Sequence, residues 1–130
     1  GTVVGAHGGW RGLADGVVDV AVGTVGRGGG RIVNAVLGPV IGPCCYEFGT
    51  DELRAVAGGT HANPEAIIGR TSDGSQALDV AAAVCAALGR FGVRLDAVGP
   101  CTGCDDRWFS HRARSDAGRQ ATVAVIEAAA

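Results

Sequence analysis

The sequence predicts an α+β domain in which mixed β-sheets pack against helices, and three observations support this prediction. Short apolar, β-branched runs alternate with stretches of helical periodicity along the 130 residues. Glycine and proline turns separate these segments, and no linker interrupts them. Hydrophobic residues make up 47% and charged residues 18%, as is typical of a globular chain. We therefore expect residues 1–130 to form a single domain or part of one.

The first quarter of the chain predicts a strand, a helix and a second strand. Residues 2–6 are apolar and β-branched and stop at a glycine turn, which favours a buried strand. Residues 13–25 place apolar side chains at helical spacing, and the glycines at 28–30 end that helix. Residues 31–37 form the second strand candidate, which Gly-Pro turns close.

The middle of the chain predicts shorter elements. Residues 51–56 favour a short helix, residues 58–64 a loop and residues 66–70 a short strand. Residues 72–75 predict a turn with a helix N-cap.

Residues 76–91 then show the clearest amphipathic pattern of the chain. This pattern predicts a helix that buries Cys85 as a small core residue and ends at Gly92. Residues 94–98 predict a strand, and the alternation over residues 119–126 predicts a closing strand.

Charge and cysteine content narrow the class of partner and the compartment. The net charge is −2 and all eleven basic residues are arginine, so we expect neither nucleic acid nor an anionic membrane surface as a partner. No apolar run is long enough to span a bilayer, and no signal peptide is visible. Five cysteines, an odd number, favour reduced thiols and a cytoplasmic protein.

The segment His-Gly-Gly-Trp-Arg-Gly over residues 7–12 holds the first candidate functional residues. A neutral imidazole beside glycines suits a metal ligand or a general base, so His7 is a candidate for either role. It can equally be a histidine that hydrogen-bonds across a turn. Arg11 can give a bidentate donor to phosphate or carboxylate, or lie on the surface.

Two pairs of cysteines form further candidates. Cys44 and Cys45 follow two Gly-Pro pairs, and a nucleophilic thiol there would need a helix N-terminus or a cationic neighbour. Packing beside a structural turn is the alternative. Cys101 and Cys104 form a Cys-x-x-Cys pair that suits half a zinc site or a redox pair. Because a second such pair is absent, the sequence does not predict a four-cysteine zinc site.

Residues 105–114 mix acidic, aromatic, hydroxyl, histidine and arginine side chains. Such a mixture suits a small anionic or aromatic ligand, and Ser110 and Arg112 are the candidates for binding it. A basic surface loop is the alternative. His61 lies in an expected loop and is not a candidate.

These segments together resemble the bacterial laccase-domain family, also called multicopper polyphenol oxidase, purine nucleoside phosphorylase or peptidoglycan-editing factor. Residues 7–14 resemble its His-Ala-Gly-Trp-Arg-Gly signature, and residues 37–49 its Leu-Gly-Pro-x-Ile-Gly-Pro segment. Residues 77–80 resemble its Leu-Asp helix start. Its closing motifs are matched by Cys-Thr at 101–102, the Phe-Ser-His-Arg segment at 109–112 and Gly-Arg at 118–119.

The resemblance implies a zinc-dependent cytoplasmic enzyme of α+β fold. The implied reactions are phosphorolysis of adenosine, inosine and methylthioadenosine, and deamination of adenosine. Copper-dependent oxidation of phenols and editing of peptidoglycan precursors are the other attributions. The implied partners are a purine nucleoside and phosphate.

The resemblance also implies that the chain is the C-terminal half of the family domain. The family's metal is held by two histidines and one cysteine, and His7 corresponds to the last of these ligands. The other two belong to motifs upstream of this chain, which also lacks methionine, so we expect a processed, truncated or partial chain. The first strand and helix of the chain would normally pack against the missing half, so we expect them to leave an exposed apolar face or a sheet edge.

Three hypotheses follow. The chain is part of a purine nucleoside phosphorylase, with His7 as a metal ligand and Arg11, Ser110 and Arg112 near the substrate. Alternatively, it is a catalytically incomplete fragment that acts only with its missing N-terminal half. The third hypothesis is independent cysteine chemistry at either cysteine pair.

Overall fold

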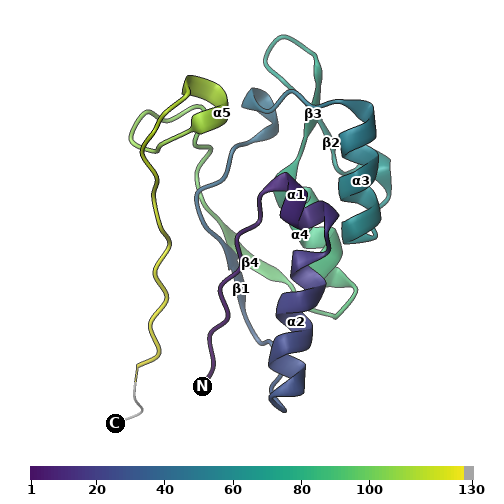
Figure 1. Ribbon diagram of the computed structural model, residues 1–130, viewed down its shortest axis with the longest axis vertical. Coiled ribbons are helices and arrows are strands. Elements are labelled where there is room, and N and C mark those ends of the chain that lie inside the picture. The colour runs from purple at the N-terminus through teal and green to yellow at the C-terminus, as the bar shows by residue number, and fades with distance from the viewer. Residues whose placement is uncertain (128–130) are drawn as a thin grey trace.

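A short apolar helix, α4 (Val80–Gly89), lies at the centre of the computed structural model, which describes residues 1–127. It contacts three other helices, α1 (Trp10–Ala14), α2 (Val17–Arg27) and α3 (Thr50–Thr60). It also contacts the strand β4 (Leu95–Val98), so that one helix links the helical part of the fold to a sheet (Figure 1).

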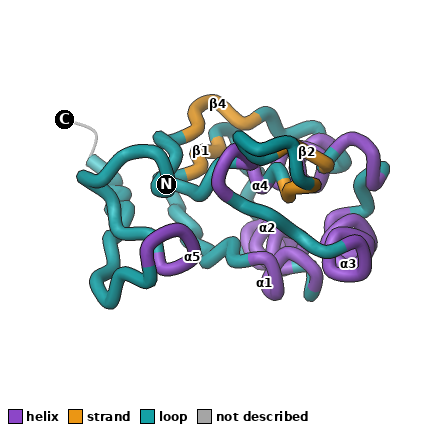
Figure 2. The backbone as a smooth tube through the Cα atoms, turned by 90° about the horizontal axis from the view of Figure 1, so that it is seen from above, coloured by secondary structure: helices purple, strands orange, loops and turns teal. Residues whose placement is uncertain are grey.

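Two small sheets complete the architecture. The strand β1 (Ala35–Leu37) pairs in parallel with β4, while β2 (Ile68–Arg70) and β3 (Gln76–Leu78) form an antiparallel hairpin. Figure 2 shows the strands along one face of the molecule and α1 and α3 along the other. Helices with one parallel and one antiparallel sheet confirm the predicted mixed α+β class.

The core forms where α1, α3, α4 and the β2–β3 hairpin meet. Its largest fully buried apolar side chains are Leu13, Val56, Ile67 and Leu78. Partly buried apolar side chains from α2 and β1 pack against this centre. Burial of apolar area is the main stabilising contribution in such a core.

The N-terminal predictions are corrected in two places. Residues 2–6, all described, are extended and exposed instead of forming a buried strand. The predicted helix over residues 13–25 is two helices, because Gly16 adopts a left-handed conformation (φ 76°) between α1 and α2. Gly28 follows the last residue of α2, as predicted.

The helix predicted over residues 51–56 is longer than expected. α3 continues to Thr60, into the predicted loop at residues 58–64, and His61 ends it in the left-handed conformation (φ 53°). Asp51 and Glu52 in its first turn interact favourably with the positive end of the helix dipole.

The predicted helix over residues 76–91 begins late. Residues 76–78 form β3, and the side chain of Asp79 accepts a hydrogen bond from the Ala82 N–H as the N-cap of α4. The N-cap predicted at 72–75 is instead the turn of the β2–β3 hairpin. The Leu-Asp helix start that the family resemblance implied is therefore confirmed.

The predicted burial of Cys85 is wrong. Cys85 is exposed, because α4 turns a different face to the core. That buried face consists of Val80, Ala83, Val84, Ala87 and Leu88.

The later strands agree in part with the sequence. The strands predicted over 31–37, 66–70 and 94–98 appear in shorter form as β1, β2 and β4. Residues 119–126 do not form the predicted closing strand: they are extended and exposed, and run along one side of the molecule (Figure 1).

Large apolar side chains are exposed along the β1–β4 sheet and both terminal segments. Val36 on β1 is 69% exposed and Val98 on β4 is 50% exposed. Val33 and Val123 are also exposed. In the part of the chain that the structure describes, no helix has the length and apolar character of a membrane span.

Candidate functional site

Four cysteines from distant parts of the chain converge at one end of the β1–β4 sheet. The Sγ atoms of Cys44, Cys45, Cys101 and Cys104 all lie within 4.8 Å of one another. The Sγ of Cys44 is 3.7 Å from that of Cys101, 3.2 Å from that of Cys104 and 3.7 Å from that of Cys45. Cys45 and Cys104 are 3.4 Å apart at Sγ. We call these residues the cysteine cluster.

The parallel pairing of β1 and β4 explains this convergence. Both strands run in the same direction, so the segments that follow them leave the sheet at the same end. Val40 and Cys101 continue the pairing as an isolated parallel bridge, and the Thr102 N–H donates to the Val40 carbonyl oxygen at 3.0 Å. Cys44 and Cys45 follow in the short 3₁₀ helix η1 (Pro43–Cys45).

Two glycines allow the cysteines to approach one another closely. A Cβ on Gly103 would lie 2.5 Å from the Cβ of Cys45 and 2.8 Å from its Sγ. A Cβ on Gly42 would lie 3.1 Å from the Sγ of Cys101. Larger side chains at these positions would push the two cysteine pairs apart.

The thiols of the cluster differ in acidity. Burial opposes ionisation of Cys101, but backbone N–H groups of Gly42, Cys104 and Gly103 lower its pKa to about 7. The Gly42 N–H donates to this Sγ at 3.0 Å. In contrast, the hydrogen bond with Cys104 and then burial raise the pKa of Cys44 well above the usual thiol value. Burial also raises the pKa of Cys45.

The cluster is positioned to hold a metal ion. This corrects the sequence prediction: with one Cys-x-x-Cys pair, at residues 101–104, the sequence predicted no four-cysteine site. The missed signal is the tripeptide Gly-Pro-Cys, which occurs at residues 42–44 and again at 99–101. Each copy lies beyond a strand of the same parallel pair, so the two copies meet.

The short helix α5 (His111–Arg114) rests on the loop that holds the second cysteine pair. The guanidinium of Arg114 donates to the carbonyl oxygens of Thr102, at 3.1 Å, and Gly103, at 3.2 Å. Arg114 also pairs with Asp116 at 3.1 Å. The position of α5 is thus tied to the position of the cysteine loop.

Tyr46, which directly follows Cys45, forms an aromatic cluster with Phe48 and with Trp10 of α1. The ring of Phe48 meets Trp10 edge-on at 5.5 Å and Tyr46 at 4.9 Å between centroids. Arg11 places its Cζ 4.4 Å from the centroid of Trp10, and Arg112 places its Cζ 5.6 Å from that of Tyr46. Two of the candidate substrate-binding residues therefore lie on the same aromatic cluster.

The charges of Arg11 and Arg112 both act on the phenol of Tyr46. Burial raises the pKa of its phenol, while the positive charges of Arg112 and Arg11 act in the opposite direction. The guanidinium of Arg112 also donates to the Glu47 carbonyl oxygen at 3.2 Å, which fixes it near this tyrosine.

Ser110, the third candidate substrate-binding residue, is the buried N-cap of α5. Its hydroxyl accepts a hydrogen bond from the Ala113 N–H at 3.4 Å, and its own N–H donates to Asp116 at 2.8 Å. Ser110 thus sets the start of the helix that carries Arg112.

His7, the candidate metal ligand, is exposed in the segment before α1. Its Nε2 lies 3.2 Å from the position that a Cβ on Gly9 would occupy. Among residues 1–127, His7 joins no group of three or more potential metal ligands. The structure therefore keeps His7 separate from the cysteine cluster.

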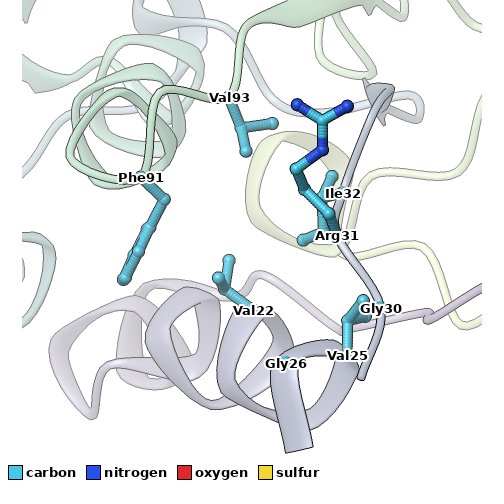
Figure 3. Close-up of a pocket in the computed structure, with 8 residues that line it drawn as sticks. All are labelled: Val22, Val25, Gly26, Gly30, Arg31, Ile32, Phe91 and Val93. Atoms are coloured by element: carbon cyan, nitrogen blue, oxygen red, sulfur yellow. The ribbon is translucent and has the colours of Figure 1, made fainter. Parts of the chain in front are cut away.

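Two of the shallow cavities in the described structure differ in their relation to the candidate site. One, of about 200 Å³, is apolar and lies between α2 and the segment after α4, where Val22 and Val93 point toward one another (Figure 3). It contains no candidate site residue. The other, of about 210 Å³, is lined by Gly42, Asp79 and Cys101 among others and borders the cysteine cluster.

Comparison with known proteins agrees with the motifs. The chain matches the family described as multi-copper polyphenol oxidoreductase laccase over residues 1–127. It is 34% identical over 128 residues to a purine nucleoside phosphorylase of Pseudomonas aeruginosa, covering 96% of this chain and 52% of that protein. It is 38% identical over 125 residues to one of Streptomyces coelicolor, covering 93% of this chain and 50% of that protein.

A purine nucleoside phosphorylase of Xylella fastidiosa is 36% identical over 124 residues, with 92% of this chain and 47% of that protein covered. The chain thus spans about half the length of these curated relatives. No solved structure matches it. The chain belongs to the multi-copper polyphenol oxidoreductase laccase family, an enzyme family in which its curated relatives are named purine nucleoside phosphorylase.

Proposed function

We propose that this chain forms part of a zinc-dependent purine nucleoside phosphorylase. The substrates would be adenosine, inosine and methylthioadenosine together with phosphate, and adenosine would also be deaminated by hydrolysis. Relatives at 34–38% identity that carry this name support the proposal. The structural observation that supports it best is the pair Arg11 and Arg112 on one aromatic cluster.

The chemistry of phosphorolysis requires groups that suit this arrangement. An oxygen of phosphate forms a bond to C1′ of the ribose while the bond from C1′ to the purine nitrogen breaks. Arg11 or Arg112 would hold the phosphate, because guanidinium groups bind its oxygens in a bidentate manner. The hydroxyl of Ser110 would contribute a hydrogen bond to the substrate, since an accepting hydroxyl still has a proton to donate.

The zinc of this proposal cannot be held by the residues around His7 alone. Three protein ligands with one open position are usual for a catalytic zinc, and His7 stands apart from any such group within residues 1–127. We therefore propose that His7 supplies one ligand and that a polypeptide equivalent to the other half of the relatives supplies two. We derive no reaction step through this metal.

Such a polypeptide would also cover the exposed apolar face. Val36 and Val98 lie exposed on neighbouring strands, in a sheet that contains β1 and β4 among residues 1–127. Exposed apolar surface of this kind favours association with a complementary partner. The five free cysteines are consistent with a reducing compartment, and we propose that the protein is cytoplasmic.

The experiment is a reconstitution. The chain is co-expressed with the part of the Pseudomonas aeruginosa relative that it does not match, and release of adenine from adenosine is measured. We expect activity that needs zinc, phosphate and both polypeptides. Activity of the chain alone would contradict the partner proposal, and an inactive zinc-loaded complex would contradict the phosphorylase proposal.

Oxidation of phenols with copper is a second candidate function, favoured by the description of the family that the chain matches. The same reconstituted complex, loaded with copper in place of zinc, tests it by oxygen uptake with a phenolic substrate. Oxygen uptake without adenosine phosphorolysis would favour this second function.

A further inference from the structure

We propose that Cys44, Cys45, Cys101 and Cys104 bind one Zn²⁺ as a closed four-thiolate site that holds the fold together. The proposal concerns residues that the proposed phosphorylase chemistry does not use. It rests on the convergence of four thiols from two separate segments.

The spacing of the sulfur atoms is that of ligands around a single ion. A tetrahedral zinc with bonds of about 2.3 Å to sulfur sets neighbouring sulfur atoms at about 3.8 Å from one another. Cys44 lies at 3.7 Å from both Cys45 and Cys101 at Sγ. The Cys104 Sγ lies slightly closer, at 3.2 Å from Cys44 and 3.4 Å from Cys45, so the ion requires only a small expansion there.

The chemistry of the ligands favours zinc. Four sulfur ligands in a tetrahedral arrangement select zinc or iron, and exclude magnesium and calcium, which prefer oxygen. The sulfur of Cys101 also accepts a hydrogen bond from the Gly42 N–H at 3.0 Å. Hydrogen bonds of this kind, from groups that do not bind the metal themselves, orient metal ligands. With all four positions filled by protein, no open position is left for a substrate, which is typical of a structural site.

The location of the site explains what it would stabilise. β1 has three residues and β4 has four, so few backbone hydrogen bonds hold the segments beyond them. A zinc ion would join the segment after β1 to the segment after β4. Through the bonds of Arg114 to Thr102 and Gly103, it would also fix α5, which carries Arg112.

The experiment measures metal content and ligand chemistry together. The chain is purified without chelator, zinc is counted by mass spectrometry, and cobalt is substituted for zinc to record its absorption. We expect one zinc per chain and the intense bands of a tetrahedral cobalt thiolate. Cys104→Ser, which changes the exposed member of the cluster, and Cys101→Ser should lose stoichiometric zinc and these bands. Cys85→Ser, an exposed thiol on α4, is the matched control and should retain both.

Four outcomes would overturn the proposal. These are no metal after refolding with excess zinc, stoichiometric iron or copper in place of zinc, two disulfides within the cluster, or zinc that survives both serine variants. His7→Ala distinguishes this site from the proposed catalytic metal: it should keep the zinc of the cysteine cluster. An inactive reconstituted enzyme whose chain still holds this zinc would refute the proposed function and leave the site intact.

Discussion

The sulfur atoms of Cys44 and Cys101 lie 3.7 Å apart although 57 positions separate the two residues in the sequence. The contact is a consequence of the parallel pairing of β1 with β4, which brings both downstream segments to the same end of the sheet. It makes the cysteine cluster sensitive to any change that separates these two segments.

Gly103→Ala should separate them. The new methyl group would lie 2.5 Å from the Cβ of Cys45, so we expect a loss of about 1–3 kcal/mol in the free energy of unfolding. Urea unfolding measures this loss, and repetition with a chelator separates the steric effect from metal binding. Gly5→Ala is the control, because no atom lies within 4 Å of its Cβ position. Equal stability of the two variants would contradict the close contact at Gly103.

Adjacent glycines in α3 should respond in opposite directions. A Cβ on Gly59 would clash with the backbone carbonyl oxygen of Ala14, so Gly59→Ala should destabilise the contact between α1 and α3 by about 1–3 kcal/mol or more. A Cβ on Gly58 meets no atom within 4 Å, and Gly58→Ala should stabilise the helix by about 0.5–1 kcal/mol. Urea denaturation of both variants measures the difference. The same sign for both would show that α1 and α3 do not pack as described.

The phenol of Tyr46, the only tyrosine of the chain, should titrate above its usual pKa of about 10. Burial is the main cause, and it favours the neutral form. Absorbance of tyrosinate at alkaline pH gives the midpoint, and the unfolded chain in guanidinium gives the reference. Arg112→Gln should raise the midpoint further, because the positive charge of Arg112 lowers the pKa.

The raised pKa of Tyr46 also makes the stability of the fold depend on pH. Because the folded state keeps the phenolic proton at higher pH than the unfolded state, the contribution of Tyr46 to the free energy of unfolding is complete below about pH 10. It is lost as pH rises through the folded pKa. A folded midpoint at or below the unfolded one would contradict the burial of Tyr46.

His7→Ala should abolish phosphorolysis by the reconstituted complex without unfolding the chain. Loss of an outer-shell partner of a metal ligand can lower activity by roughly 100-fold. Removal of a direct ligand should lower the rate by at least this factor. Initial rates at saturating zinc measure the effect. His61→Asn is the control, because asparagine tolerates the left-handed conformation that His61 adopts at the end of α3. Full activity of His7→Ala would refute its role as a ligand.

The sequence alone determined the features that depend on local chemistry. The motifs at residues 7–14 and 37–49 indicated the family, and the resemblance to its Leu-Asp helix start placed the beginning of α4. The aspartate N-cap at this point satisfies a backbone N–H group within its own helix turn. Gly28 also ends α2 where the sequence predicted the end of a helix. These signals act over a few residues, so no partner element is needed to read them.

Only the tertiary structure decided which faces are buried and which distant residues meet. Cys85 was expected in the core but is exposed, since the face that α4 buries depends on the positions of α1, α2 and α3. Residues 2–6 and 119–126 have the composition of strands and yet are unpaired, because a strand requires a neighbour to satisfy its backbone. The cysteine cluster was hidden for the same reason: two Gly-Pro-Cys segments become one site only when β1 and β4 pair in parallel.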